Sequence, residues 1–167
     1  MFYNSEMGEN WLNKTETQAW RGFHALRTDL ISHLARELVR ECGLSESEYR
    51  ILVAVSEAPH RRIRARDLCQ VLGWERSRLS RQISRMENRG TVQRVDCESD
   101  ARGFDVRLTP SGLATITAAA PIHLQAVRHC FIDLLTTEQM NVLSEISEIV
   151  GEHLASEHSH RDDLKLD

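Results

Sequence analysis

Hydrophobic side chains recur every three or four positions in the first third of the chain, which is typical of a long amphipathic helix. The pattern predicts a helix from Trp11 to Arg40, followed by Gly43, a residue type that commonly ends helices in the left-handed conformation. Its apolar face includes Trp20, Phe23, Leu26, Leu30, Leu34 and Leu38. Residues 1–10 are small and polar, so we expect a flexible arm before this helix.

A second helix is predicted from Ser45 to about Glu57. Ser45 and Glu48 have the spacing of a capping box, in which each side chain satisfies a backbone N–H at the helix start. Pro59 disfavours helical geometry at the residue before it and therefore closes this helix. Ile63 stands between arginines and is compatible with one short strand.

Two short helices are predicted next, over Ala65–Leu72 and Arg76–Arg89, with a break at Gly73. The second of them has hydrophobic residues on one face only, namely Leu79, Ile83 and Met86. Its opposite face carries Ser77, Arg78, Arg81, Gln82 and Arg85. Such a helix has one side that fits a hydrophobic core and another that offers hydrogen-bond donors to a partner.

The hydrophobic period then changes to two, which indicates strands. Val92 and Val95 predict one strand, and residues Phe104–Leu108 alternate apolar and polar side chains as a second strand. The polar stretch 98–103 separates them, so the two strands predict a β-hairpin. The Thr109-Pro110 pair follows, in which threonine can cap a new helix and proline can occupy its first position.

The last third of the chain is helical again. We expect a helix over Pro110–Leu135, which Pro121 should kink or interrupt, and a final helix over Thr136–Leu154. The buried face of the final helix is expected to consist of Leu143, Ile146, Val150 and Leu154. Residues 156–167 are polar and are expected to form a flexible tail.

Basic residues are concentrated in one segment. The whole chain has a formal net charge of −4, but residues 60–94 hold ten arginines and three acidic residues, which gives this segment a charge of +7 and the rest −11. A basic block in an acidic chain indicates a polyanionic partner. Arginine in particular presents a planar fork of donors that fits phosphates and guanine edges.

Two helices followed by a hairpin have the order of a winged helix-turn-helix, whose second helix enters the DNA major groove. The sequence of residues 68–90, LCQVLGWERSRLSRQISRMENRG, resembles the helix-turn-helix of the MarR family of transcriptional regulators. The sequence of residues 100–112, DARGFDVRLTPSG, resembles the wing of that family, with its Asp-x-Arg tip, its Leu-Thr pair and the following glycine. The resemblance extends through the order of elements from Trp11 to Leu154. It implies a mainly α-helical protein with a small β-hairpin wing, flanked by long dimerisation helices.

The candidate DNA contacts lie on the second helix, on the wing and in the segment before them. They are Arg62, Arg64, Arg66, Arg76, Ser77, Arg78, Ser80, Arg81, Arg85, Asp100 and Arg102. Arg78, Arg81 and Arg85 are expected to lead the contacts in the major groove, the two serines to bind the backbone, and the three arginines before residue 70 to meet flanking phosphates. By the resemblance, Asp100 orients Arg102 for insertion into the minor groove.

Four residues depart from the family pattern. Arg64 and Glu75 stand where the two short helices commonly begin with serine or a similar cap, and Asp105 is unusual in the last strand. Trp74 is unusual in the turn, and we expect it to pack rather than to contact a base. These departures affect which DNA sequence the protein is expected to prefer.

The resemblance also implies a homodimer in which the first and last helices of the two subunits interleave. The chain then divides into an arm (1–10), a dimerisation helix (11–43), the winged helix-turn-helix (44–111), further dimerisation helices (112–155) and a tail (156–167). Two-fold symmetry predicts a pseudo-palindromic operator of double-stranded DNA with half-sites about one helical turn apart. Repression is the commoner mode of regulation in the family.

A small-molecule effector is a further expectation, because the family often binds phenolic or other aromatic anions between the dimer helices and the winged domain. The residues that can line such a cleft here are Trp20, His24, Arg27, Tyr49 and His123. Each of them is also compatible with an ordinary place in the core, at its rim or on the surface.

Two alternatives concern the same chain. A thiol-based redox sensor would use one of Cys42, Cys69, Cys97 and Cys130, although inert buried thiols are the more common state of unpaired cysteines. A protein-interaction module that binds no DNA would not need the arginine face of the second helix or Arg102 at the wing.

Other function classes find little support in the sequence. There is no glycine-rich phosphate loop and no GxSxG or HExxH motif, so we expect neither an enzyme nor a cofactor. Eight histidines show no metal-ligand spacing, so no metal is expected. No apolar stretch is long enough for a membrane span, and the N-terminus has no signal-peptide pattern, which favours the cytoplasm.

Overall fold

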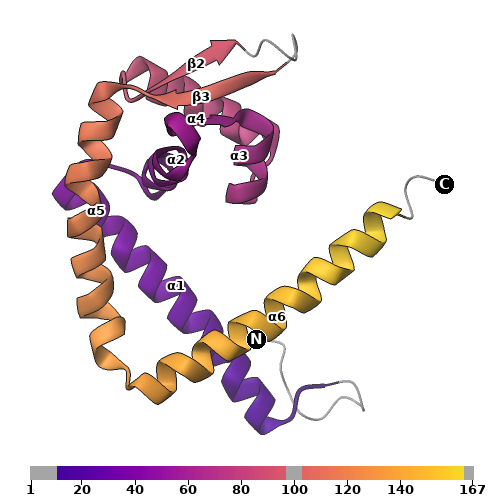
Figure 1. Ribbon diagram of the computed structural model, residues 1–167. Coiled ribbons are helices and arrows are strands. Elements are labelled where there is room, and N and C mark those ends of the chain that lie inside the picture. The colour runs from indigo at the N-terminus through magenta and orange to yellow at the C-terminus, as the bar shows by residue number, and fades with distance from the viewer. Residues whose placement is uncertain (1–10, 97–102, 164–167) are drawn as a thin grey trace. The chain divides into compact units, whose positions relative to one another are not determined.

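The computed structural model describes residues 11–96 and 103–163 (Figure 1). The chain divides into two compact units, Met1–Ala126 and Val127–Asp167. The first unit holds five α-helices or parts of α-helices and the only sheet found in the described residues, and the second holds the end of α5 and the last α-helix. The expected class, mainly α-helical with a small β wing, is confirmed.

Helix α1 spans Lys14–Cys42. The Asn13 side chain accepts a hydrogen bond from the Glu16 backbone N–H, and the Glu16 carboxylate accepts one from the Asn13 backbone N–H. This capping box begins the helix and stops it from extending to Trp11. Gly43 ends the helix with φ of 64°, the left-handed conformation that the sequence predicts for it. The helix is therefore slightly displaced from its predicted bounds.

Three helices form the helix-turn-helix and its support: α2 (Glu46–Glu57), α3 (Ala65–Leu72) and α4 (Arg76–Asn88). The capping box of Ser45 and Glu48 at the start of α2 is present as predicted. Gly73 links α3 to α4 in the left-handed conformation, with φ of 65°. All three helices contribute to one core, and Figure 1 shows them gathered next to the strands.

The wing belongs to a three-stranded antiparallel sheet of β1 (Arg62–Arg64), β2 (Val92–Asp96) and β3 (Phe104–Leu108), in the order β1-β3-β2. The short strand around Ile63 is thus confirmed, with Ile63 opposite Val106. Val92 lies opposite Leu108 at the base of the hairpin. The hairpin predicted from the period-two pattern is therefore joined by a third strand that comes from before the helix-turn-helix.

The core of the first unit is formed by the apolar faces of these elements. Its fully buried side chains include Ile51, Leu52, Leu68, Leu79, Ile83, Met86 and Val106. At its edge, Thr109 caps α5 by accepting a hydrogen bond from the Gly112 N–H at 3.0 Å. The backbone of Gly112 lies so close to Thr91 that a Cβ atom would come within 1.9 Å of the Thr91 carbonyl oxygen. A glycine is required here for the wing and α5 to meet.

The predicted helix over Pro110–Leu135 differs from the structure in two ways. Helix α5 runs over Pro110–Cys130 without interruption at Pro121, and a 3₁₀ turn, Ile132–Leu134, follows it. The proline removes one backbone donor, which would serve the Thr117 carbonyl, but both residues are exposed, so water can satisfy that oxygen. An exposed proline therefore does not break this helix.

The last helix, α6, spans Thr137–Asp163, so the helix predicted to end at Leu154 continues well beyond it. The apolar periodicity stops at Leu154, but no glycine or proline follows to end the helix. Residues 156–163, expected to belong to a flexible tail, are thus helical.

Candidate nucleic-acid interface

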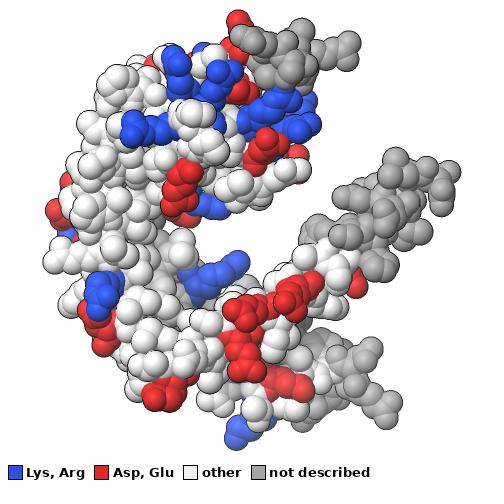
Figure 2. Space-filling view, viewed as in Figure 1, with Lys and Arg blue, Asp and Glu red and all other residues white. Residues whose placement is uncertain are grey.

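Helix α4 is two-faced, as its sequence predicts. Leu79, Ile83 and Met86 are at most 1% exposed and fix the helix in the core. Arg76, Ser77, Arg78, Arg81 and Arg85 are exposed, and Ser80 is half-buried. In the space-filling view, Lys and Arg side chains gather where α4 and the strands lie, whereas Asp and Glu side chains line the visible face of α6 (Figure 2). The candidate recognition surface is therefore a basic helix face supported by a rigid core.

The exposed arginines of α4 differ from the other arginines of the basic segment. Within residues 11–96 and 103–157, no carboxylate lies in ion-pair range of Arg76, Arg78, Arg81 or Arg85. Their guanidinium groups can therefore bind phosphates or base edges without first breaking an ion pair.

The arginines before residue 70 are placed differently. Arg62 donates from Nε to the Asp105 carboxylate at 2.6 Å, and Nε of Arg64 lies 3.9 Å from the other oxygen of that carboxylate. Arg66 pairs with its neighbour Asp67 at 3.0 Å. Asp105 is only 8% exposed. Part of the positive charge that the sequence assigns to the DNA surface is thus balanced within the first unit.

Arg94 joins the wing to α4 and was not among the predicted site residues. Its guanidinium donates to the Ser84 hydroxyl at 2.9 Å and to the Ser80 carbonyl at 3.1 Å, and it pairs with Glu87 at 2.9 Å. Its guanidinium carbon also lies 4.8 Å from the centre of the Phe104 ring. The contacts run from β2 to α4 and β3, so Arg94 fixes the orientation of the wing on the recognition helix.

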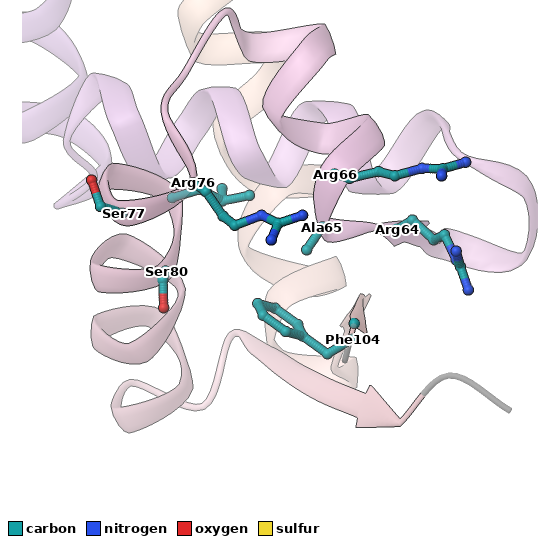
Figure 3. Close-up of a pocket in the computed structure, with 9 residues that line it drawn as sticks. Arg64, Ala65, Arg66, Arg76, Ser77, Ser80 and Phe104 are labelled. Atoms are coloured by element: carbon teal, nitrogen blue, oxygen red, sulfur yellow. The ribbon is translucent and has the colours of Figure 1, made fainter. Parts of the chain in front are cut away.

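A groove of about 700 Å³ lies between the starts of α3 and α4 and strand β3. It is lined by Arg64, Ala65, Arg66, Arg76, Ser77, Leu79, Ser80, Gly103 and Phe104. Figure 3 shows Arg76 reaching from α4 toward Ala65, while the Phe104 ring faces the groove from β3. Arg64 and Glu75, the N-cap residues of α3 and α4, form no side-chain cap bond, so N–H groups at both helix starts are left for another acceptor. Such helix starts favour phosphate groups.

Trp74 packs in the core with 7% of its surface exposed, as expected for it. The guanidinium carbon of Arg78 lies 4.1 Å from the centre of the indole ring. The wing-tip residues Asp100 and Arg102, together with Cys97, lie outside the described residues.

Comparison with known proteins identifies the family. A family model described as "MarR family" matches residues 42–103. AbsC, a MarR family transcriptional regulator from Streptomyces coelicolor, has a crystal structure that matches 89% of this chain and 99% of its own at 40% identity, with a TM-score of 0.84. The chain belongs to the MarR family.

Two further MarR family relatives extend the comparison. Sco3205 from Streptomyces coelicolor, solved in complex with DNA, is 40% identical, with 87% of this chain and 92% of that chain covered and a TM-score of 0.84. The transcriptional regulator HosA of Escherichia coli is 29% identical over 126 residues, which are 75% of this chain and 91% of HosA. The order of elements on which the resemblance rested is therefore the MarR fold.

The residues predicted to line an effector cleft in this MarR family chain do not all meet. Tyr49 and His123 do, with ring centres 4.5 Å apart, and both line a cavity of about 370 Å³ between α1, α2 and α5. Trp20 and His24 form a separate ring contact on α1, and neither they nor Arg27 line that cavity. A helix rises about 1.5 Å per residue, so Trp20 lies about 16 Å from Ile31, the nearest residue of α1 that lines the cavity.

The cavity contains a polar atom with unusual surroundings. The Nδ1 atom of His123 is buried without a hydrogen-bond partner among the described residues, and burial lowers the pKa of this side chain. Glu46 and Arg50 also line the cavity, so it has both charged and aromatic side chains.

Two of the thiols, those of Cys42 and Cys69, have a raised pKa. Burial raises the pKa of Cys42, and the charge of Glu41 acts in the same direction. Burial also raises the pKa of Cys69, against the opposing charge of Arg76. A raised pKa disfavours the reactive thiolate. Among the described residues there is no group of three metal-ligating side chains, and no helix is long and apolar enough to cross a membrane.

Proposed function

We propose that this MarR family chain is a sequence-specific DNA-binding transcriptional regulator. Helix α4 enters the major groove of double-stranded DNA, and the wing reaches the adjacent minor groove through Arg102, which Asp100 orients. Arg62, Arg64 and Arg66 lie toward flanking phosphates. The observation that carries the proposal is the outer face of α4, with four exposed arginines that no described carboxylate neutralises. The relative Sco3205, at 40% identity, was solved with DNA, which supports the same partner here.

The active form in this proposal is a homodimer on a pseudo-palindromic operator. Support comes from apolar side chains that a lone chain leaves in water on α1 and on α6. On α1 they include Trp20, Phe23, Leu26 and Ile31, and on α6 they include Val142, Ile146, Ile149 and Val150. For the direction of regulation we propose repression, the commoner mode in the family, and for the location the cytoplasm, where a bacterial regulator meets its DNA.

A small-molecule effector is a second part of the proposal. The buried Nδ1 atom of His123 beside Tyr49 favours a ligand that supplies a hydrogen-bond donor or acceptor and an aromatic face. Phenols and aromatic carboxylates have both. Benzoate and phenol should raise the melting temperature of the wild type and leave that of His123→Ala unchanged, whereas equal shifts for both proteins would place the ligand elsewhere.

DNA binding is tested by fluorescence anisotropy of the full-length protein. Labelled fragments from upstream of its own gene are compared with a scrambled duplex over a salt series. We expect one fragment to bind more tightly than the scrambled duplex, with affinity that falls steeply as salt rises. Arg81→Ala should abolish this preference. Arg36→Ala removes the same charge from an exposed position on α1 and should preserve it.

Other outcomes separate the alternatives. No binding at low salt by a folded protein would overturn the proposal and favour a protein-interaction module. Equal affinity for all fragments would leave a non-specific DNA-binding protein, or an operator elsewhere, which selection from random duplexes resolves. A redox sensor would instead lose its DNA affinity on peroxide treatment, and replacement of all four cysteines by serine would prevent that loss.

A further inference from the structure

Trp74 fills the turn between α3 and α4 and is fixed by both its backbone and its ring. The backbone N–H of Trp74 donates to the Cys69 carbonyl at 2.9 Å. The preceding Gly73 has the left-handed conformation that this turn requires. The side chain is 7% exposed and belongs to the hydrophobic core. The ring therefore cannot change its position unless the core opens.

Arg78 lies over this ring. Its guanidinium carbon is 4.1 Å from the ring centre, well within the range of a cation–π contact. Arg78 is the third residue of α4 after the N-cap Glu75, and the first residues of a recognition helix are those that reach base edges. No acceptor among the described residues takes its N–H groups. The ring thus holds the charge while the donors remain available.

A second arginine supports the same ring from α2. The guanidinium carbon of Arg50 lies 5.6 Å from the ring centre, and its terminal nitrogen donates to the Leu72 carbonyl at 3.0 Å. This hydrogen bond ties α2 to the last residue of α3, directly before the turn that carries Trp74. The ring is therefore held by α2, α3 and the turn together.

The other exposed arginines of α4 lack such a support. No aromatic ring among the described residues contacts Arg76, Arg81 or Arg85. Their side chains keep their rotamer freedom and must give it up when they bind DNA. A guanine offers two acceptors in one plane, O6 and N7, and a pair of hydrogen bonds to them needs a guanidinium in one orientation. A guanidinium that is already oriented loses less freedom when it binds.

We propose that Trp74 is a positioning residue, and that Arg78, oriented by its ring, reads one guanine in each operator half-site. The proposal rests on the DNA binding proposed above and adds which residue of α4 determines specificity. It also gives a role to the tryptophan that departs from the family pattern.

The test is a selection from a library of random DNA duplexes with the full-length wild type and variants. The wild type should enrich a motif with one strongly preferred guanine per half-site. Replacement of that guanine by adenine should weaken its binding about ten- to a hundredfold. For Trp74→Leu and Arg78→Ala the same replacement should cost less than about threefold, with the rest of the motif preserved. Trp74→Phe keeps an aromatic face and should keep the guanine preference, as should the control Arg36→Ala.

Three results would overturn the inference. The first is that Trp74→Leu keeps the guanine preference. The second is that Trp74→Leu loses affinity equally for all duplexes. The third is that Arg78→Ala selects the same motif as the wild type. A wild type that enriches no motif would instead contradict the proposed function itself, so the two failures are distinguishable.

Fluorescence gives a second measurement in case Trp74→Leu does not fold. In a Trp11→Phe, Trp20→Phe background, Trp74 is the only tryptophan left in the chain. Its emission should change when Arg78→Ala removes the cation from the ring, and it should keep its wild-type maximum when the selected duplex binds. A change on DNA binding as large as that of Arg78→Ala would mean that Arg78 leaves the ring, and would overturn the positioning role.

Discussion

Arg62 donates a hydrogen bond of 2.6 Å to the buried carboxylate of Asp105, across two strands of the wing sheet. Arg64, directly opposite Asp105 in the register, lies at 3.9 Å from the other carboxylate oxygen. One acidic residue thus faces two of the arginines that the sequence assigns to phosphate contacts. The wing sheet is less positive than its arginine content indicates.

Asp105→Asn should therefore tighten non-specific DNA binding while it weakens the fold. The loss of one negative charge near the phosphates should favour a scrambled duplex by about 0.5–1 kcal/mol at low salt, and the gain should vanish at high salt. The loss of a charge-assisted hydrogen bond should cost about 1–2 kcal/mol of stability. Anisotropy and urea unfolding measure the two effects. Asp133→Asn, which removes the same charge from the exposed Arg128–Asp133 pair, should change neither by as much.

The Asp105 contacts also show which features the sequence predicts and which it does not. Local signals such as Gly43, the Ser45–Glu48 box and the strand at Phe104–Leu108 depend on neighbours in the chain, and all three are present in the structure, although Asp105 is buried where the alternation predicts an exposed side chain. The ion pair of Arg62 with Asp105 depends on the sheet order β1-β3-β2, which joins residues 43 positions apart. A count of charges along the chain cannot predict this ion pair. A predicted pairing of the strand at Ile63 with the wing strand would have predicted it.

In the candidate site, too, the sequence predicts features that depend on neighbouring residues and not contacts between distant ones. The sequence predicts the two faces of α4 because a helix repeats every 3.6 residues. The role of Arg94 cannot be predicted in this way, because its partners in α4 lie seven or more residues away along the chain. The effector residues on α1 were grouped by chemistry alone, and helix length separates Trp20 and His24 from the cavity at Tyr49.

Arg94→Ala should weaken operator binding without changing the number of phosphates contacted. Arg94 fixes the wing to α4 through Ser84 and Glu87, so its loss should cost about 1–2 kcal/mol of stability and lower the affinity. The slope of log affinity against log salt should remain that of the wild type, whereas Arg85→Ala should reduce this slope by about one. A reduced slope for Arg94→Ala would show that Arg94 itself meets a phosphate.

Gly112→Ala should be among the most destabilising small substitutions in the chain. Its Cβ atom would lie 1.9 Å from the Thr91 oxygen and 2.8 Å from the Thr91 carbonyl carbon, so backbone must move. We expect a loss of about 3 kcal/mol, at the upper end for overpacking. Gly151→Ala is the matched control, because its Cβ has no neighbour within 4 Å and alanine should stabilise α6 by about 0.5–1 kcal/mol. Urea unfolding at equal protein concentration compares them.

Phe23→Asp and Ile146→Asp should each convert the proposed dimer into monomers. Their side chains are 53% and 52% exposed in the single chain, so neither change should unfold it. A carboxylate in an apolar interface has no partner and must be desolvated, which opposes association. Light scattering after gel filtration should give a dimer mass for the wild type and a monomer mass for both variants. Val71→Asp, at a residue 63% exposed on α3, should remain dimeric.

Glu48→Gln should reduce stability at neutral pH and make it less sensitive to acid. Burial alone would raise the pKa of Glu48, but hydrogen bonds from Ser45 and the charge of Arg89 outweigh it and lower the pKa. Because the folded pKa lies below the unfolded one, the contribution is fully present above the unfolded pKa and is lost as the pH falls through the folded pKa. Glutamine preserves the capping box but not the charge, so we expect a loss of about 1–2 kcal/mol at pH 7 that shrinks toward pH 3. Urea unfolding at several pH values measures this difference, and a difference that stays constant would contradict the ion pair with Arg89.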